Sequence, residues 1–187
     1  MGFNKEVAKS IREIIFGLED GLVSTLGTLT GVAVGTQNAS VVILSGLVLV
    51  AVEATSMAAG SYLSSKTAQE AEKAWVTSEN KKTKTNKNKV DLFQAHPVQS
   101  GLVMWVCYAL GGAVPLLPYL LFPLEWAFFL SIVITFITLF GVGAWSSLYT
   151  KRDWLRSAIE MLAISCAAAL LGYVVGRIAG VYLPIVN

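Results

Sequence analysis

The chain has 187 residues, of which 55% are apolar and 14% are charged, and its formal net charge is +2. Its mean hydropathy of +0.63 is too high for a soluble domain of this size. Composition therefore argues against a soluble fold and indicates an integral membrane protein.

Residues 1–13 carry charged side chains in a helical polar pattern, ahead of the first apolar run. A cleaved signal peptide would place a short apolar region directly after a few basic residues, which this segment does not do. We expect residues 1–13 to form a cytosolic amphipathic segment and the first apolar run to remain in the protein.

Five apolar runs are long enough to cross a bilayer, which takes about 20 helical residues. They lie near residues 14–36, 41–64, 99–122, 125–148 and 155–180. Because these runs lack the alternation of barrel strands, they predict an all-α bundle of five transmembrane helices. Short connections, TQNAS after the first run and the Phe122 region after the third, predict two antiparallel hairpins.

Lysine and arginine gather in three regions: ahead of the first span, between residues 66 and 89, and between residues 151 and 156. In a five-span chain these regions lie on one side, and the loops of the opposite side contain neither residue. The positive-inside rule therefore predicts a cytosolic N-terminus and an external C-terminus.

The segment 65–98, between the second and third spans, is the long polar part of the chain. Its first half, through about Glu79, has helix-forming composition and could extend the second span into the cytosol. The run NKKTKTNKNK reads as a solvated linker or a contact with anionic lipid. It lacks interleaved aromatic residues, so we expect no nucleic-acid partner.

Carboxylates inside the apolar runs are the residues that call for a function. A charged side chain near a span centre costs about 2.5 to 3.5 kcal/mol on insertion scales. At 1.5 Å per residue, Asp20 lies about 9 Å into the first span, and Glu160 lies about 9 Å into the fifth. Met57 lies about 11 to 12 Å into the second span, with Glu53 one turn deeper on the same helix face.

These groups are predicted to form one layer that binds a cation or a proton, since no basic residue of the other spans is placed to neutralise it. Carboxylates with one thioether suit Fe²⁺ or Mn²⁺ better than Mg²⁺ or Ca²⁺, which prefer oxygen-only ligands. The alternatives are that Met57 is an ordinary core residue and that Glu19, nearer the interface, is simply hydrated.

Catalysis finds little support in the sequence. The single histidine, His96, stands at the entrance to the third span with no partner for a metalloprotease, hydrolase or thiol-based site. Cys107 and Cys166 stand singly within apolar runs and are interpreted as core-filling thiols. Phosphate-binding glycine loops are absent. We therefore expect neither an enzyme nor a bound cofactor.

Four stretches carry a family resemblance: IREIIFGLEDGLVSTLGTLTGVAVG, EATSMAAGSYLSSK, GGAVPLLPYLL and WLRSAIEMLAISCAAALLGYVVG. Together they resemble the vacuolar iron transporter family, which also includes the yeast vacuolar calcium cross-complementer type of iron and manganese transporter. The resemblance runs through all five spans in order. It implies a five-helix homodimer that exports Fe²⁺ or Mn²⁺ from the cytosol, in exchange for protons.

The family's metal-binding aspartate falls on Asp20 and its methionine on Met57. Plant members place a glutamate two turns before this methionine, where the chain has Leu49, and Glu53 stands one turn before it instead. Plant members also carry a longer cytosolic metal-binding domain, here replaced by a segment with no methionine. The resemblance leaves Glu70, Glu72 and Glu79 as a residual capture site there, with Glu79 nearest the register of a family ligand.

The expected mechanism is a homodimer in which the first spans face each other across a central pathway. Asp20 would be the main hard ligand, Met57 the soft one, and Glu53 a further ligand or the proton-exchanging carboxylate, while Glu19 would guide cations at the entrance. A non-transporting scaffold, a metal-responsive accessory protein and a passive channel are the alternatives. We expect a prokaryotic plasma membrane, with a vacuolar membrane as the other option.

Overall fold

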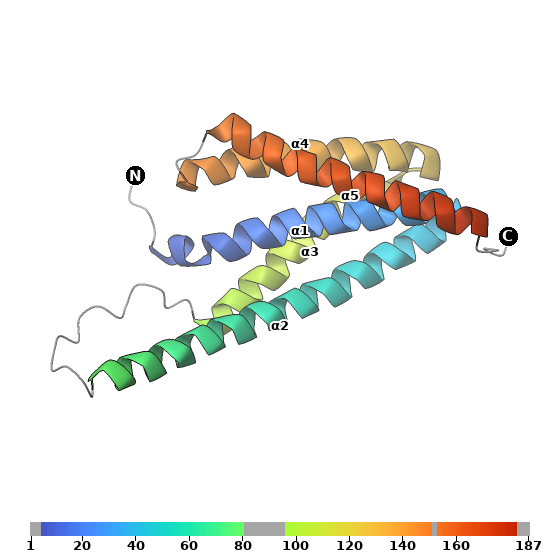
Figure 1. Cartoon of the computed structure of the whole chain (residues 1–187). Helices are drawn as coiled ribbons and strands as arrows, with labels where there is room; N and C mark the ends of the chain where they lie inside the picture. The colour runs from blue at the N-terminus through green and yellow to red at the C-terminus, as the bar shows by residue number, and fades with distance from the viewer. Residues whose placement is uncertain (1–4, 81–95, 151–152, 183–187) are drawn as a thin grey trace.

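The computed structural model describes residues 5–80, 96–150 and 153–182, with side chains for residues 10–75, 96–149 and 153–182. These residues form five helices and no strand (Figure 1). The helices are α1 (Lys5–Thr36), α2 (Ala39–Asn80), α3 (Pro97–Leu121), α4 (Leu124–Thr150) and α5 (Trp154–Tyr182). The all-α prediction is confirmed, and each predicted apolar run lies within one helix except for Phe122, which caps the end of α3.

Helix α1 occupies the middle of the bundle and packs against all four other helices. Figure 1 shows α4 and α5 along one side of α1, and α2 with α3 along the other. Side chains on α1 can therefore face two different surroundings, depending on their angular position around the helix.

Four of the five helices are long and apolar enough to cross a membrane: α2 as far as Trp75, α3, α4 as far as Tyr149, and α5. The spans predicted in these helices are confirmed by that measure. The run at 14–36 lies in α1. This run is long enough to cross a membrane, but its hydropathy is lowered by two carboxylates and by many Gly, Ser and Thr residues. That α1 also crosses the membrane stays a prediction. Its central position fits this composition, because an enclosed helix needs less lipid-facing surface.

Both predicted short connections are present. Between α1 and α2, Gln37 adopts a φ of 50°. Asn38 then caps α2, since its Oδ1 accepts hydrogen bonds from the backbone N–H of Ser40 at 3.0 Å and of Val41 at 3.3 Å. Between α3 and α4, the N–H of Phe122 donates to the carbonyl of Pro118 at 2.9 Å. Each pair of helices thus reverses direction within a few residues.

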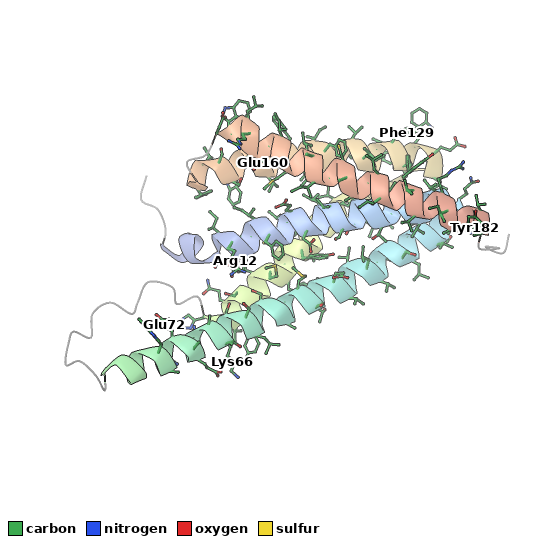
Figure 2. The ribbon with its side chains drawn as sticks, in the orientation of Figure 1. Arg12, Lys66, Glu72, Phe129, Glu160 and Tyr182 are labelled. Atoms are coloured by element: carbon green, nitrogen blue, oxygen red, sulfur yellow. The ribbon has the colours of Figure 1, made fainter. Side chains whose placement is uncertain are left out.

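The predicted extension of the second span is confirmed, because α2 continues without a break to Asn80. Its C-terminal part projects beyond the other helices in Figure 1, and Figure 2 shows Lys66 and Glu72 on this part. Most of the predicted lysine-rich linker lies outside the described residues. At the other end of the chain, the predicted amphipathic segment is helical from Lys5 and continuous with the rest of α1.

Glycines hold α1 against α5. A Cβ added at Gly31 would lie 2.8 Å from the carbonyl oxygen of Gly172, and one added at Gly35 would lie 3.0 Å from that of Gly176. A Cβ at Gly172 would overlap the carbonyl oxygen of Gly27. These small residues therefore let the backbones of α1 and α5 come into close contact. Gly60 on α2 makes no such contact, since a Cβ added there would meet nothing within 4 Å.

Gly172→Ala should lower the thermal unfolding midpoint of the detergent-solubilised protein, because the new methyl group must push two backbones apart. Overpacking of this kind costs about 1 to 3 kcal/mol. Gly141→Ala on α4 is the matched control, since its added Cβ would meet nothing within 4 Å. Equal midpoints for the two variants would contradict the backbone contact between α1 and α5.

Candidate functional site

A second pair of glycines brings α3 against the turn of α1 that carries Asp20. A Cβ at Gly17 would lie 2.9 Å from the Cβ of Cys107 and 3.2 Å from the backbone nitrogen of Tyr108. A Cβ at Gly21 would overlap the carbonyl oxygen of Tyr108. These two glycines flank Asp20 in sequence, so the close approach fixes Tyr108 beside the aspartate.

A hydroxyl pair links the two helices at this level. The Oγ of Ser24 lies 2.6 Å from the hydroxyl oxygen of Tyr108, and it donates to the backbone carbonyl of Asp20 at 2.6 Å. The Tyr108 side chain is completely buried. The hydrogen bond therefore satisfies a phenol that has no access to water.

Two carboxylates, Asp20 on α1 and Glu53 on α2, interact through their charges. Asp20 and Glu53 are both half-buried, and they lie close enough for their charges to repel each other. Tyr108 lies within electrostatic range of both. No ion pair between either carboxylate and a lysine or arginine occurs in the described part of the chain. The described residues thus leave the negative charge of this pair to be balanced by something else.

Met57 is half-buried and stands four residues after Glu53 on α2. Residues at this spacing share a helix face, so the thioether and the glutamate carboxylate lie one turn apart on the same side of α2. Asp20 and Glu53 therefore stand on neighbouring helices within range of each other's charge, and Met57 lies along the same face of α2 as Glu53.

Glu19 and Glu160 belong to a different place. They line a pocket of about 230 Å³ between α1, α4 and α5, together with Met161 and with Ser146 and Ser157, whose hydroxyls are 3.1 Å apart. Consecutive residues of a helix point about 100° apart, which lets Glu19 face α4 and α5 while Asp20 faces α2.

Glu160 was expected at the depth of Asp20 and in one layer with it. The structure instead sets it across α1 with Glu19 in the described pocket. Its Oε1 accepts a bond from the Nε of Arg156 at 3.3 Å. Both members of that ion pair are largely exposed, so it contributes little to stability. Figure 2 shows Glu160 near the N-terminal end of α5.

The predicted capture residues lie on the projecting part of α2. Glu72 is half-buried there, and the side chain of Glu79 lies outside the described residues. Seven residues separate them, so they share a face but stand about 10.5 Å apart along the axis. A single ion could not bridge that distance directly, and their role as a capture site stays a prediction.

Among the residues that the structure describes, no group of three or more His, Cys, Asp or Glu side chains is arranged to hold a metal ion. A complete coordination shell would therefore need other donor types, water, or residues from a second copy of the chain.

Two residues of the Asp20 site were not predicted: Tyr108 and Ser24. The third span contains no charged residue, so nothing in its composition drew attention to it. The spacing of Gly17 and Gly21 around Asp20 is the signal that could have indicated a close helix neighbour there.

Apolar helices that enclose unneutralised carboxylates define a membrane protein that handles cations, because such carboxylates are rare in spans unless they serve an ion or a proton. The comparison of the sequence with known proteins agrees with this class. The chain belongs to the VIT family, whose model matches residues 11–94 and 88–177.

Vacuolar iron transporter 1 of Arabidopsis thaliana is 26% identical over 213 residues, which cover 90% of this chain and 85% of that protein. The vacuolar iron transporter of Centaurea cyanus is 25% identical, over 88% of this chain and 86% of its own length. An uncharacterized protein of Methanocaldococcus jannaschii is 29% identical, over 89% of this chain and 88% of its own length.

Family membership confirms the resemblance that the four sequence stretches carried. It also confirms that the protein is a transporter rather than an enzyme, with metal as substrate and no cofactor. Together with the four apolar helices, it places the protein in a membrane.

Glu53→Gln should raise the thermal unfolding midpoint in metal-free buffer, because it removes the repulsion with Asp20. Like charges several ångströms apart at a half-buried site are worth about 1 kcal/mol. Glu70→Gln on the exposed part of the same helix is the control and should leave the midpoint unchanged. If both variants melt like the wild type, Asp20 and Glu53 do not repel each other as described.

Proposed function

We propose that the protein exports a divalent transition metal, Fe²⁺ or Mn²⁺, from the cytosol, and that Asp20, Glu53 and Met57 bind the ion on its way. The observation that carries this proposal is the pair of half-buried carboxylates on α1 and α2, with no described basic partner. Family membership supports it, and so do the two plant relatives that are named as iron transporters.

The donor set explains the choice of metal. Asp20 is the hard ligand, Met57 is the soft ligand that discriminates against Mg²⁺ and Ca²⁺, and Glu53 is a further ligand or the carboxylate that exchanges protons. Carboxylates must be deprotonated to bind metal, so loading of the ion releases protons and unloading takes them up. This linkage provides a physical route to proton exchange.

The functional unit that we propose is a homodimer. One copy supplies too few ligands for a six-coordinate ion, whereas two copies of Asp20, Glu53 and Met57 could complete the shell. Glycine contacts with α5 cover the C-terminal half of α1. In the N-terminal half, Phe16 is 48% exposed, which supports a contact between the first spans of two copies at that end.

On the cytosolic side, Glu19 and Glu160 provide a negatively charged pocket near the entrance, and Glu72 and Glu79 extend the negative charge along α2. This assignment uses the orientation predicted from lysine and arginine, with the N-terminus in the cytosol and the C-terminus outside. The host membrane that we propose is a prokaryotic plasma membrane, and a vacuolar membrane is the alternative.

Proteoliposomes that contain a metal-sensitive dye test transport directly. We expect Mn²⁺ and Fe²⁺ uptake by the wild type that responds to a pH gradient. Asp20→Asn should reduce uptake at least tenfold, equivalent to about 1.4 kcal/mol, and Glu19→Gln should have a much smaller effect. Absence of uptake by the wild type would favour the scaffold or accessory protein. Uptake that is indifferent to the pH gradient would favour a channel.

Met57→Leu tests the soft ligand, because it removes the sulfur and keeps the side-chain volume nearly constant. We expect a loss of Fe²⁺ uptake and a weaker preference for Fe²⁺ over Mg²⁺ in competition. Met104→Leu, a buried methionine on α3, should leave both unchanged. Wild-type selectivity in Met57→Leu would show that the thioether is not a ligand.

A further inference from the structure

The direction of the hydrogen bond between Ser24 and Tyr108 follows from a count of hydrogens. A serine hydroxyl carries one hydrogen, and that of Ser24 is donated to the backbone carbonyl of Asp20 at 2.6 Å. The contact of 2.6 Å between the two hydroxyl oxygens must then be a donation from Tyr108 to Ser24. The phenol hydrogen is therefore engaged away from the carboxylates.

This direction leaves the Tyr108 oxygen with free acceptor capacity at Ser24, on the face of α1 that carries Asp20 one turn away. Asp20 and Glu53 both lie within electrostatic range of it. Without Ser24, the phenol hydrogen would be drawn towards the negative charge of these carboxylates and would compete with a cation for their oxygens. With that hydrogen held by Ser24, the hydroxyl pair adds only acceptor oxygen to the site, which suits a cation and its bound water.

The position of the Tyr108 ring is fixed from both sides. Gly17 and Gly21 hold the backbone of Tyr108 against α1, and the side chain itself is completely buried. Ser24 stands four residues after Asp20, one turn along the same helix, and its own hydrogen bond ties it to the aspartate. The phenol oxygen thus has little freedom to leave the carboxylate pair.

We propose that the hydroxyl oxygen of Tyr108 serves the cation site as an acceptor and raises the affinity of this site for the cation. Ser24 is the positioning residue, because it holds the phenol hydrogen away from the carboxylates. The proposal rests on the proposed function, in which Asp20 and Glu53 bind the transported ion. It adds to the site a neutral oxygen from α3, a helix that contributes no carboxylate to it.

Four variants test the pair through the equilibrium binding of Mn²⁺ in detergent, followed by the electron paramagnetic resonance signal of free Mn²⁺. Tyr108→Phe and Ser24→Ala should each raise the Kd about tenfold, the effect expected for one hydrogen-bonding group at a charged site. Ser24→Thr keeps a hydroxyl and should retain the wild-type Kd. The double variant should match Tyr108→Phe alone, because no phenol hydrogen remains to be misdirected.

Transport in proteoliposomes supplies the second readout. Weaker binding should raise the KM for Mn²⁺ by a similar factor and leave the maximal rate close to that of the wild type. Tyr119→Phe is the matched control, since Tyr119 is also buried on α3 but lies eleven residues further along, and its Kd should not change. If Tyr108→Phe does not fold, the comparison of Ser24→Ala with Ser24→Thr decides the question.

A wild-type Kd in both Tyr108→Phe and Ser24→Ala would overturn the proposal. So would a fall in maximal rate with no change in Kd or KM, which would indicate a structural role. A wild type that binds Mn²⁺ but does not transport it would sink the transport function and leave the Tyr108 proposal to be judged by the Kd values. A wild type that binds no Mn²⁺ would overturn both.

Discussion

Backbone contact at glycines is the constraint on which this structure depends. Within a membrane, helices gain little from burying apolar side chains against each other, so close packing must hold them together. Gly17 and Gly21 let α3 approach α1 around Asp20, and the row that includes Gly31 lets α5 approach the C-terminal half of α1. Packed in this way, α1 holds two adjacent carboxylates, Glu19 and Asp20, inside the bundle. The two side chains face different neighbouring helices.

The electrostatic surroundings of Asp20 and Glu19 therefore differ. On one side of α1, Asp20 and Glu53 repel each other beside a buried phenol. The packing of the helices has to offset this repulsion as long as no positive charge is bound. On the other side, Glu19 faces a pocket where Glu160 already has Arg156 as a partner. We propose that the first arrangement binds a cation, because binding would relieve the repulsion between Asp20 and Glu53. The second is better suited to attract ions than to hold them.

Much of the fold was accessible from the sequence, because apolar run length and turn residues are local properties. The five helices, both tight connections and the extension of α2 to Asn80 follow from them. The site was accessible only in part. Counting residues gives depth along a span but not direction around it, so Glu160 matched Asp20 in depth and yet lies across α1 from it. Tyr108 was missed because its role arises from a contact between helices, which no single segment encodes.

The glycine contact between α1 and α5 has a periodic character. Its rows repeat every four residues on both helices, from Gly27 to Gly35 and from Gly172 to Gly180. After a relative slide of one repeat, about 6 Å, two parallel helices with such rows would again set glycine against glycine, except at the ends of the rows. Ala168 continues the α5 row by one repeat and already lies against Gly27. The glycine contact between α1 and α5 therefore fixes the distance between the two helices more strictly than it fixes their axial register.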